Sequence, residues 1–487
     1  MRLFDSFWDR CPALYYSLFI LFGALGALAF DPLLFVPLSV LLLHRSWRAL
    51  LALVGGLLFW FYVSSSIIYP PDWADGVEGV ATFEVVDWTH EMRYNRPYCK
   101  MKLFVHSFEA KNSSFYAQNI PCRLSWSHIG SRPKAGFIYK AESTLSIRDG
   151  NYSIKMDSPR RLRASYSLAE WRSLAKSKVK IILAKFLPVG DTRAFLEGVL
   201  IGEFHDTHLK EGLKRFGLQH ITVVSGFHFS LIAVILAAFF RLLLPWKYTN
   251  LALIIATTAY LLFIGPSASV LRAWVACSLL FLSKIVERDS NGLNALGVGL
   301  IVVLTLDPTA ALELGFQLSF LATFAILLLY PLFDPILSDL FPKRSATELL
   351  EMPFSEQLTF VLLRFFTASF ALILSVSVLM LPMSLYAFGE FPLFGIIYNA
   401  FFPFLVSIGV FVVSIAFLFI WFEPICAFFF QIAAAILNAA LTLVTHAPSG
   451  LDANLTATWL TGFWLVLYLL VASFFSIIFY QRRKGIE

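Results

Sequence analysis

Long apolar stretches dominate the second half of this chain and restrict what it can fold into. Between Phe365 and Gln481 the only charged residues are Glu390, Glu423 and Asp452. Over all 487 residues, 14% are charged and 58% are hydrophobic, whereas soluble domains carry about 25% charged residues. A soluble fold could not present so little charge to water. The sequence therefore predicts a polytopic α-helical membrane protein.

The lengths of the apolar stretches predict about 11–12 transmembrane segments, since about 20 apolar residues span a bilayer. Three are expected early, at 13–30, 32–43 and 49–68. The segment 32–43 is short, and is either a span or one arm of a re-entrant hairpin. Nine more are expected near 222–244, 249–264, 267–285, 291–306, 312–332, 358–386, 391–421, 424–446 and 456–480.

Loop charges predict the orientation, because cytoplasmic loops are enriched in Lys and Arg. If the N-terminus is cytoplasmic, the opposite loops near 265, 307, 389 and 450 contain no Lys or Arg. The cytoplasmic loops and tail then carry Arg45, Arg48, Arg241, Lys247, Lys284, Arg288, Lys343, Arg344, Arg482, Arg483 and Lys484. We expect both termini in the cytoplasm of a bacterium, the spans in its inner membrane, and residues 70–215 in the periplasm.

The segment from Gly79 to Pro159 alternates apolar and polar residues, as in VATFEVVDW and KMKLFVHSF. Such alternation, interrupted by turn residues, predicts short antiparallel strands. About five strands in eighty residues fit a small β-barrel of the oligonucleotide-binding (OB) type, and a different small β-sandwich would have a similar sequence. We expect four regions: N-terminal helices (1–69), an extracytoplasmic OB-like domain (70–163), basic amphipathic helices at the membrane surface (164–215) and a transmembrane channel domain (216–487).

From Ser167 to Leu187 the pattern changes to a helical period. One apolar stripe consists of Leu168, Trp171, Ala175, Val179, Ile182, Leu183 and Phe186, and the basic residues off it are Arg172, Lys176, Lys178, Lys180 and Lys185. A basic amphipathic helix of this kind typically lies on a membrane surface. The alternative is a helix packed on its own protein.

Positive charge is concentrated in the region expected outside the cell. From Arg93 to Arg215 there are 23 Lys and Arg residues against 10 Asp and Glu residues, interleaved with aromatic residues. A positive groove with aromatic faces binds single-stranded nucleic acid; the alternative is a solvated basic face over core aromatics, with attraction to anionic lipid. The residues that would gather a DNA strand are Arg93, Arg96, Lys100, Lys102, Arg123, Arg132, Lys134 and Lys140.

Two of the five cysteines, Cys99 and Cys122, lie in this polar region and could form a disulfide in an oxidising compartment. No CxxC pair is present, which disfavours a zinc site. We expect no metal and no cofactor.

Four clusters of polar residues interrupt the membrane segments. They are FGLQHITVVSGFHF from Phe216, GPSASVLRAW from Gly265, ELGFQLSFLATF from Glu313 and YNAFFP from Tyr398. Polar groups inside a membrane normally face a protein interior or a water path, and an intramembrane Arg suits an oxyanion. Alternatively, Arg272 pairs with Glu313 or a backbone carbonyl. The candidate path residues are His220, Ser225, Gly226, His228, Ser267, Arg272, Gln317, Ser319 and Asn399.

These four clusters, in this order, resemble the competence domain of the ComEC family, which has GlxHxxxxSGxH, GxxxSxxRA, GFQLSFxA and N-x-x-x-P-type elements. Val223 and Val224 stand where the family commonly has Ala and Ile. The resemblance covers about residues 190–420, and the expected barrel matches the family's N-terminal domain. It implies an inner-membrane channel that carries single-stranded DNA into the cytoplasm during natural transformation.

The resemblance also implies the partners: single-stranded DNA, the lipid bilayer, a periplasmic DNA receptor and a separate cytoplasmic motor ATPase, with a homodimer as one possible assembly. Many members carry a metallo-β-lactamase-like nuclease domain, but the sequence contains neither an HxHxDH cluster nor a GxxxxGK[ST] phosphate loop. We therefore expect no enzymatic activity. The alternatives are a small-molecule permease or lipid flippase, and an intramembrane serine hydrolase that uses Ser225 with His228 or His220.

Overall fold

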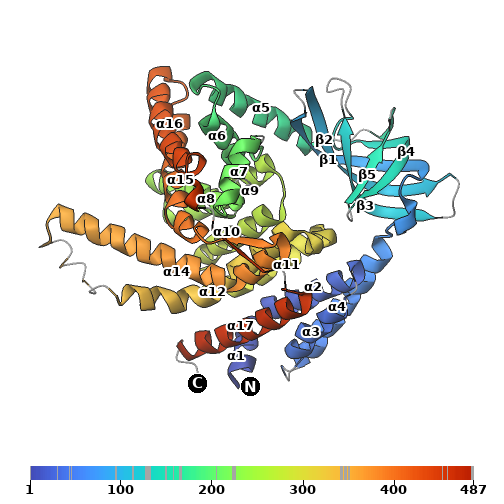
Figure 1. Ribbon diagram of the computed structural model, residues 1–487, viewed down its shortest axis with the longest axis horizontal. Coiled ribbons are helices and arrows are strands. Elements are labelled where there is room, and N and C mark those ends of the chain that lie inside the picture. Colours follow the sequence, from blue (N-terminus) through green and yellow to red (C-terminus); the bar gives the residue numbers. More distant parts are fainter. Residues whose placement is uncertain are drawn as a thin grey trace. The chain divides into compact units, whose positions relative to one another are not determined.

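The computed structural model in Figure 1 describes residues 2–29, 31–42, 44, 47–93, 96–111, 115–126, 133–148, 151–156, 158–163, 167–204, 206–221, 226–340, 344, 348, 351–451, 453–457 and 459–483. The chain divides into two compact units. The first comprises Met1–Leu58, Phe186–Ala259 and Pro266–Glu487, and the second comprises Phe59–Lys185 and Tyr260–Gly265.

Helices make up most of the first unit. They are α1 (Arg2–Arg10), α2 (Pro12–Leu28), α3 (Phe35–Leu41), α4 (Trp47–Ser66, which continues into the second unit), α6 (Asp191–Ile201), α7 (Thr207–Arg215), α8 (Gly226–Leu243), α9 (Trp246–Ile264, which ends in the second unit), α10 (Ala268–Ile285), α11 (Gly292–Leu306), α12 (Leu314–Ser338), α14 (Phe354–Phe388), α15 (Gly395–Leu418), α16 (Glu423–Thr445) and α17 (Gly462–Arg483). A small hairpin pairs β7 (Glu390–Pro392) with β8 (Asn454–Thr456).

The prediction of a polytopic helical membrane protein is confirmed. Within the described ranges, nine helices are long and apolar enough to cross a membrane, or ten if α1 and α2, which meet at a bend of 94°, form one span. Two further apolar helices, Pro32–Leu41 and Gly292–Leu306, are shorter than a span requires. All twelve expected segments are therefore helical, but these two lack the length to cross the bilayer as straight helices.

The bend between α1 and α2 is held by residues of α11. The Oδ1 atom of Asn294 accepts the Ala13 backbone N–H at 3.0 Å, and its Nδ2 donates to the Arg10 carbonyl at 2.9 Å. Because the first N–H groups of a helix have no partner within it, Asn294 acts as a cap supplied by another helix. α11 thereby fixes the direction in which α2 starts.

The second unit contains a closed five-stranded barrel, and this confirms the OB-like prediction. Its strands are β1 (Glu78–Arg93), β2 (Arg96–Ala110), β3 (Tyr116–Trp126), β4 (Ile138–Arg148) and β5 (Asn151–Lys155), and β6 (Arg160–Arg163) flanks β4. The order is β1-β2-β3-β5-β4, and β4 pairs back with β1 to close the ring (Figure 1). The β3–β5 pair is parallel and the other pairs of the ring are antiparallel.

Alternating residues of these strands fill the barrel. Phe83, Val85, Met101, Leu103 and Val105 are almost fully buried, as the period-2 pattern predicts. The helix expected at 167–187 is α5 (Leu168–Phe186), which lies mostly in the same unit.

Candidate functional site

Arg272 is held between three membrane helices of the first unit. Its Nε donates to the Oγ of Ser319 on α12 at 3.0 Å, and its Cζ lies 5.9 Å from the centroid of the Phe320 ring. On α11, a Cβ added to Gly299 would lie 3.6 Å from the Arg272 Cγ. In the part of the chain that the structure describes, Arg272 has no carboxylate partner, so the alternative pairing with Glu313 is absent.

Gly226, the first residue of α8, leaves the space that the Arg272 guanidinium occupies. A Cβ at Gly226 would lie 2.7 Å from the Arg272 Nη2 and 3.6 Å from the Ala273 Cβ. The N-terminus of a helix carries a partial positive charge, so a guanidinium beside it is electrostatically unfavourable by itself. An anion between them would interact favourably with both groups.

The structure thus brings three predicted path residues together, Gly226, Arg272 and Ser319. Others make local hydrogen bonds. Ser267 is exposed and caps α10 by accepting from the Val270 N–H at 3.4 Å. The amides of Gln317 and Asn399 donate to the carbonyls of Ala311 (2.9 Å) and Gly395 (2.7 Å).

The two histidines predicted to line the path, His220 and His228, differ in exposure. His220 is exposed, with its Nδ1 3.2 Å from the Gly217 carbonyl, whereas His228 in the first turn of α8 is only 1% exposed. Ser225 lies outside the described residues. Two contributors to the Arg272 environment, Gly299 and Phe320, were not predicted, because neither stands out from its apolar segment in the sequence.

Basic side chains gather on the outer faces of two strand pairs of the barrel. Lys102 on β2 and Arg123 on β3 are register partners and both are exposed, and half-buried Phe104 is two residues along β2. Lys140 on β4 pairs in register with exposed Arg160 on β6. Lys134 is exposed and Lys100 is half-buried. Arg132 lies outside the described residues, as do the side chains of Arg93 and Arg96.

The structure does not join the two cysteines for which a disulfide was possible. Cys99 is the register partner of Trp126, while Cys122 is the partner of Leu103, and both cysteines are buried thiols. Their offset of four positions along neighbouring strands corresponds to about 13 Å, whereas a disulfide needs Cα atoms within about 7 Å. Burial raises the pKa of the Cys122 thiol to about 12.

Arg172, which the sequence placed among the basic residues off the apolar stripe of α5, is buried. It is 7% exposed. The apolar stripe, in turn, is partly exposed, since Leu168 and Trp171 are each 55% accessible.

Among the described residues, no group of three or more His, Cys, Asp or Glu side chains could hold a metal ion.

Comparison with known proteins identifies the relatives of the chain. It is 22% identical to ComE operon protein 3 of Bacillus subtilis over 174 residues, which are 35% of this chain and 22% of the relative. It is 27% identical to an uncharacterized protein of Mycoplasma genitalium over 139 residues, 28% of this chain and 36% of the relative. The matches thus cover about a fifth to a third of each relative's length. No solved structure gives a significant match.

A family model described as Competence protein matches residues 202–484. This segment contains the Gly226–Arg272–Ser319 cluster and is more than half of the chain. The chain therefore belongs to the Competence protein family.

Proposed function

We propose that this protein is an inner-membrane channel that carries single-stranded DNA into the cytoplasm during natural transformation. The observation that carries the proposal is the position of Arg272, a guanidinium without a carboxylate partner in the described part of the chain, beside the N-terminus of α8. Membership of the Competence protein family and the likeness to ComE operon protein 3 support the same function.

The chemistry of the cluster suits a moving phosphodiester chain. Arg272 stays charged at all physiological pH values and offers several donors to phosphate oxygens. The first N–H groups of α8 and the Ser319 hydroxyl add neutral donors nearby. One fixed charge with neutral donors favours entry of each phosphate and still permits its release, as conduction requires.

The barrel would gather the strand outside. Lys102 and Arg123 form a positive pair on the β2–β3 face, the face that OB folds use for oligonucleotides. Phe104 lies beside them, where a base could stack. In this proposal a periplasmic receptor delivers the DNA and a separate cytoplasmic ATPase supplies the pulling force.

The test is uptake of labelled DNA into the cytoplasm, with protein level and membrane insertion checked for each variant. Arg272→Ala should reduce cytoplasmic DNA at least about tenfold while DNA bound at the cell surface is unchanged, and Arg272→Lys should retain part of the uptake. The matched control is Lys284→Ala, which removes an exposed cation from the same helix. Normal uptake by Arg272→Ala would exclude this role for Arg272, and normal uptake by a full deletion would exclude the channel.

The gathering role has a separate test. Replacing Lys102 and Arg123 with Glu should weaken binding of single-stranded DNA to the purified protein. The slope of log affinity against log salt should also fall by about 0.7 for each lost phosphate contact. Lys155→Glu with Lys178→Glu is a charge-matched control on exposed positions of the same unit. Equal losses in both double variants would mean that only net charge matters.

A further inference from the structure

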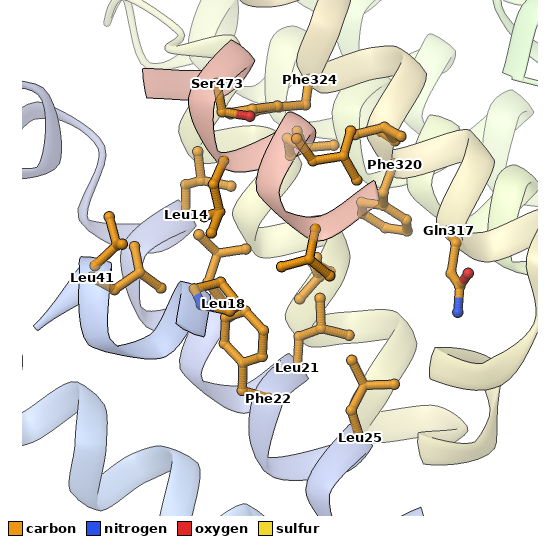
Figure 2. A pocket seen from close by; sticks show the side chains of 18 of the residues that line it. Leu14, Leu18, Leu21, Phe22, Leu25, Leu41, Gln317, Phe320, Phe324 and Ser473 are labelled. Atoms are coloured by element: carbon orange, nitrogen blue, oxygen red, sulfur yellow. The ribbon is translucent and has the colours of Figure 1, made fainter. Parts of the chain in front are cut away.

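The first unit contains an apolar cavity of about 380 Å³ (Figure 2), and Gly226, Arg272 and Ser319 are not among the residues that line it. Side chains of α1, α2, α3, α11, α12, α14 and α17 line it. Among the described residues, the polar side-chain groups in its wall are the Gln317 amide, the Ser473 hydroxyl and the Trp8 indole N–H. The Gln317 amide already donates to the Ala311 carbonyl. The other lining side chains are apolar, so the wall is suited to a hydrocarbon ligand.

One wall is a continuous seam on α2. Leu14, Leu18, Leu21 and Leu25 are spaced by four, three and four residues and point into the cavity (Figure 2). This spacing is that of a coiled-coil seam, which normally packs against a neighbouring helix. Here Leu18, Leu21 and Leu25 are only half-buried, since the space in front of them holds no protein side chain.

Another part of the wall is a second seam of the same length. Val466, Leu470, Ser473 and Ile477 of α17 repeat the spacing of four, three and four residues. Each seam extends over eleven residue steps, or about 16 Å. One leaflet of the hydrocarbon core of a bilayer is about 15 Å deep. The length of each seam therefore matches the depth that one lipid acyl chain spans in a leaflet.

The size and the walls of the cavity suit a single alkyl chain. Its volume is about 380 Å³, and helices that are apolar enough to cross a membrane contribute to its wall. Apolar cavities of roughly 150 Å³ already bind a small hydrocarbon and exclude water. A single alkyl chain fits both the size and the chemistry.

We propose that this cavity is a binding site for one acyl chain of a membrane phospholipid, which packs between the α2 and α17 seams as a resident ligand. The acyl chain replaces the missing helix–helix contact and joins the N-terminal helices to α17. Phe320 borders both this cavity and Arg272, but lipid retention is measured without DNA, so either proposal can fail without the other.

The test is native mass spectrometry of the full chain, reconstituted in vesicles of phosphatidylethanolamine and phosphatidylglycerol and then extracted into a mild detergent. The wild type should retain one phospholipid. Ser473→Trp and Leu18→Trp, which fill the cavity, should retain at least fivefold less. The matched control Phe475→Trp changes a residue of α17 that is 53% exposed and outside the cavity wall, and it should retain lipid as the wild type does.

A second measurement covers variants that fold poorly. Delipidation should lower the unfolding temperature of the wild type and of Phe475→Trp, and should leave that of Ser473→Trp unchanged. The proposal is overturned if the wild type retains no phospholipid, if all variants retain it equally, or if the retained mass is a detergent, a free fatty acid or a second protein chain.

Discussion

Arg172 on α5 donates from Nη1 to the Oδ2 of Asp87 on β1 at 2.8 Å, and from Nε to the Leu262 carbonyl at the end of α9 at 3.1 Å. Gly265 makes this possible, because a Cβ there would lie 2.8 Å from the same Nη1, and its φ of 103° is unfavourable for other residues. One buried guanidinium thus joins a helix, a barrel strand and the end of a membrane helix within the second unit.

Arg172→Ala should destabilise the second unit by about 1–3 kcal/mol, because a carboxylate and a carbonyl lose their charged partner. Protease digestion or denaturant unfolding followed at the barrel measures the change. Lys178→Ala, an exposed cation on the same helix, is the control and should stay near the wild type. If the double variant Asp87→Ala/Arg172→Ala loses as much as the two single variants together, the two side chains are not coupled.

Gly226→Ala should disturb the Arg272 guanidinium without unfolding the protein. The new methyl group would come 2.7 Å from Nη2, the flexible end of a side chain that can move away. We expect DNA uptake to fall about tenfold, the effect of losing one charge-assisted hydrogen bond, with unchanged protein level. Gly315→Ala on α12 adds a methyl group that meets nothing within 4 Å. Equal uptake in the two variants would separate Gly226 from transport.

The sequence predicted the strands and helices themselves better than the contacts between them. The alternating pattern located strands β1 to β4, and the helical period located α5 to within a residue at each end, because both patterns are local. The burial of Arg172 was not predictable, since its partners Asp87 and Leu262 are 85 and 90 residues away. The Gly226–Arg272 proximity depends in the same way on helix packing. Whether Cys99 and Cys122 lie close enough to pair was open for a related reason, because spacing along the sequence does not determine strand register.

Cys99 and Cys122 should both stay unmodified when the folded protein is treated with maleimide near neutral pH. Both are at most 3% exposed, and the raised pKa of Cys122, about 12, keeps its thiol protonated. After unfolding without reductant, both should react, as peptide mass mapping would reveal. Protection that persists until a reductant is added would mean that a disulfide forms.

The raised pKa of Cys122 also implies that the free energy of unfolding falls as the pH rises from 9 toward 12, because the thiol loses its proton first in the unfolded chain.

Gly297→Ala should prevent α11 from packing against α2. An added Cβ would lie 2.3 Å from the Leu14 nitrogen and 2.4 Å from the Ala13 carbonyl carbon. These backbone atoms cannot move without breaking the hydrogen bond from the Ala13 N–H to the Asn294 side chain. We expect a loss of several kcal/mol, as for overpacked cores, and a sharp fall in folded protein by size-exclusion chromatography. In Gly299→Ala, two residues along the same helix, the new methyl group makes an ordinary contact 3.6 Å from the Arg272 Cγ, so folded yield should be preserved. Equal yields for the two variants would show that α2 and α11 are less closely packed in the membrane.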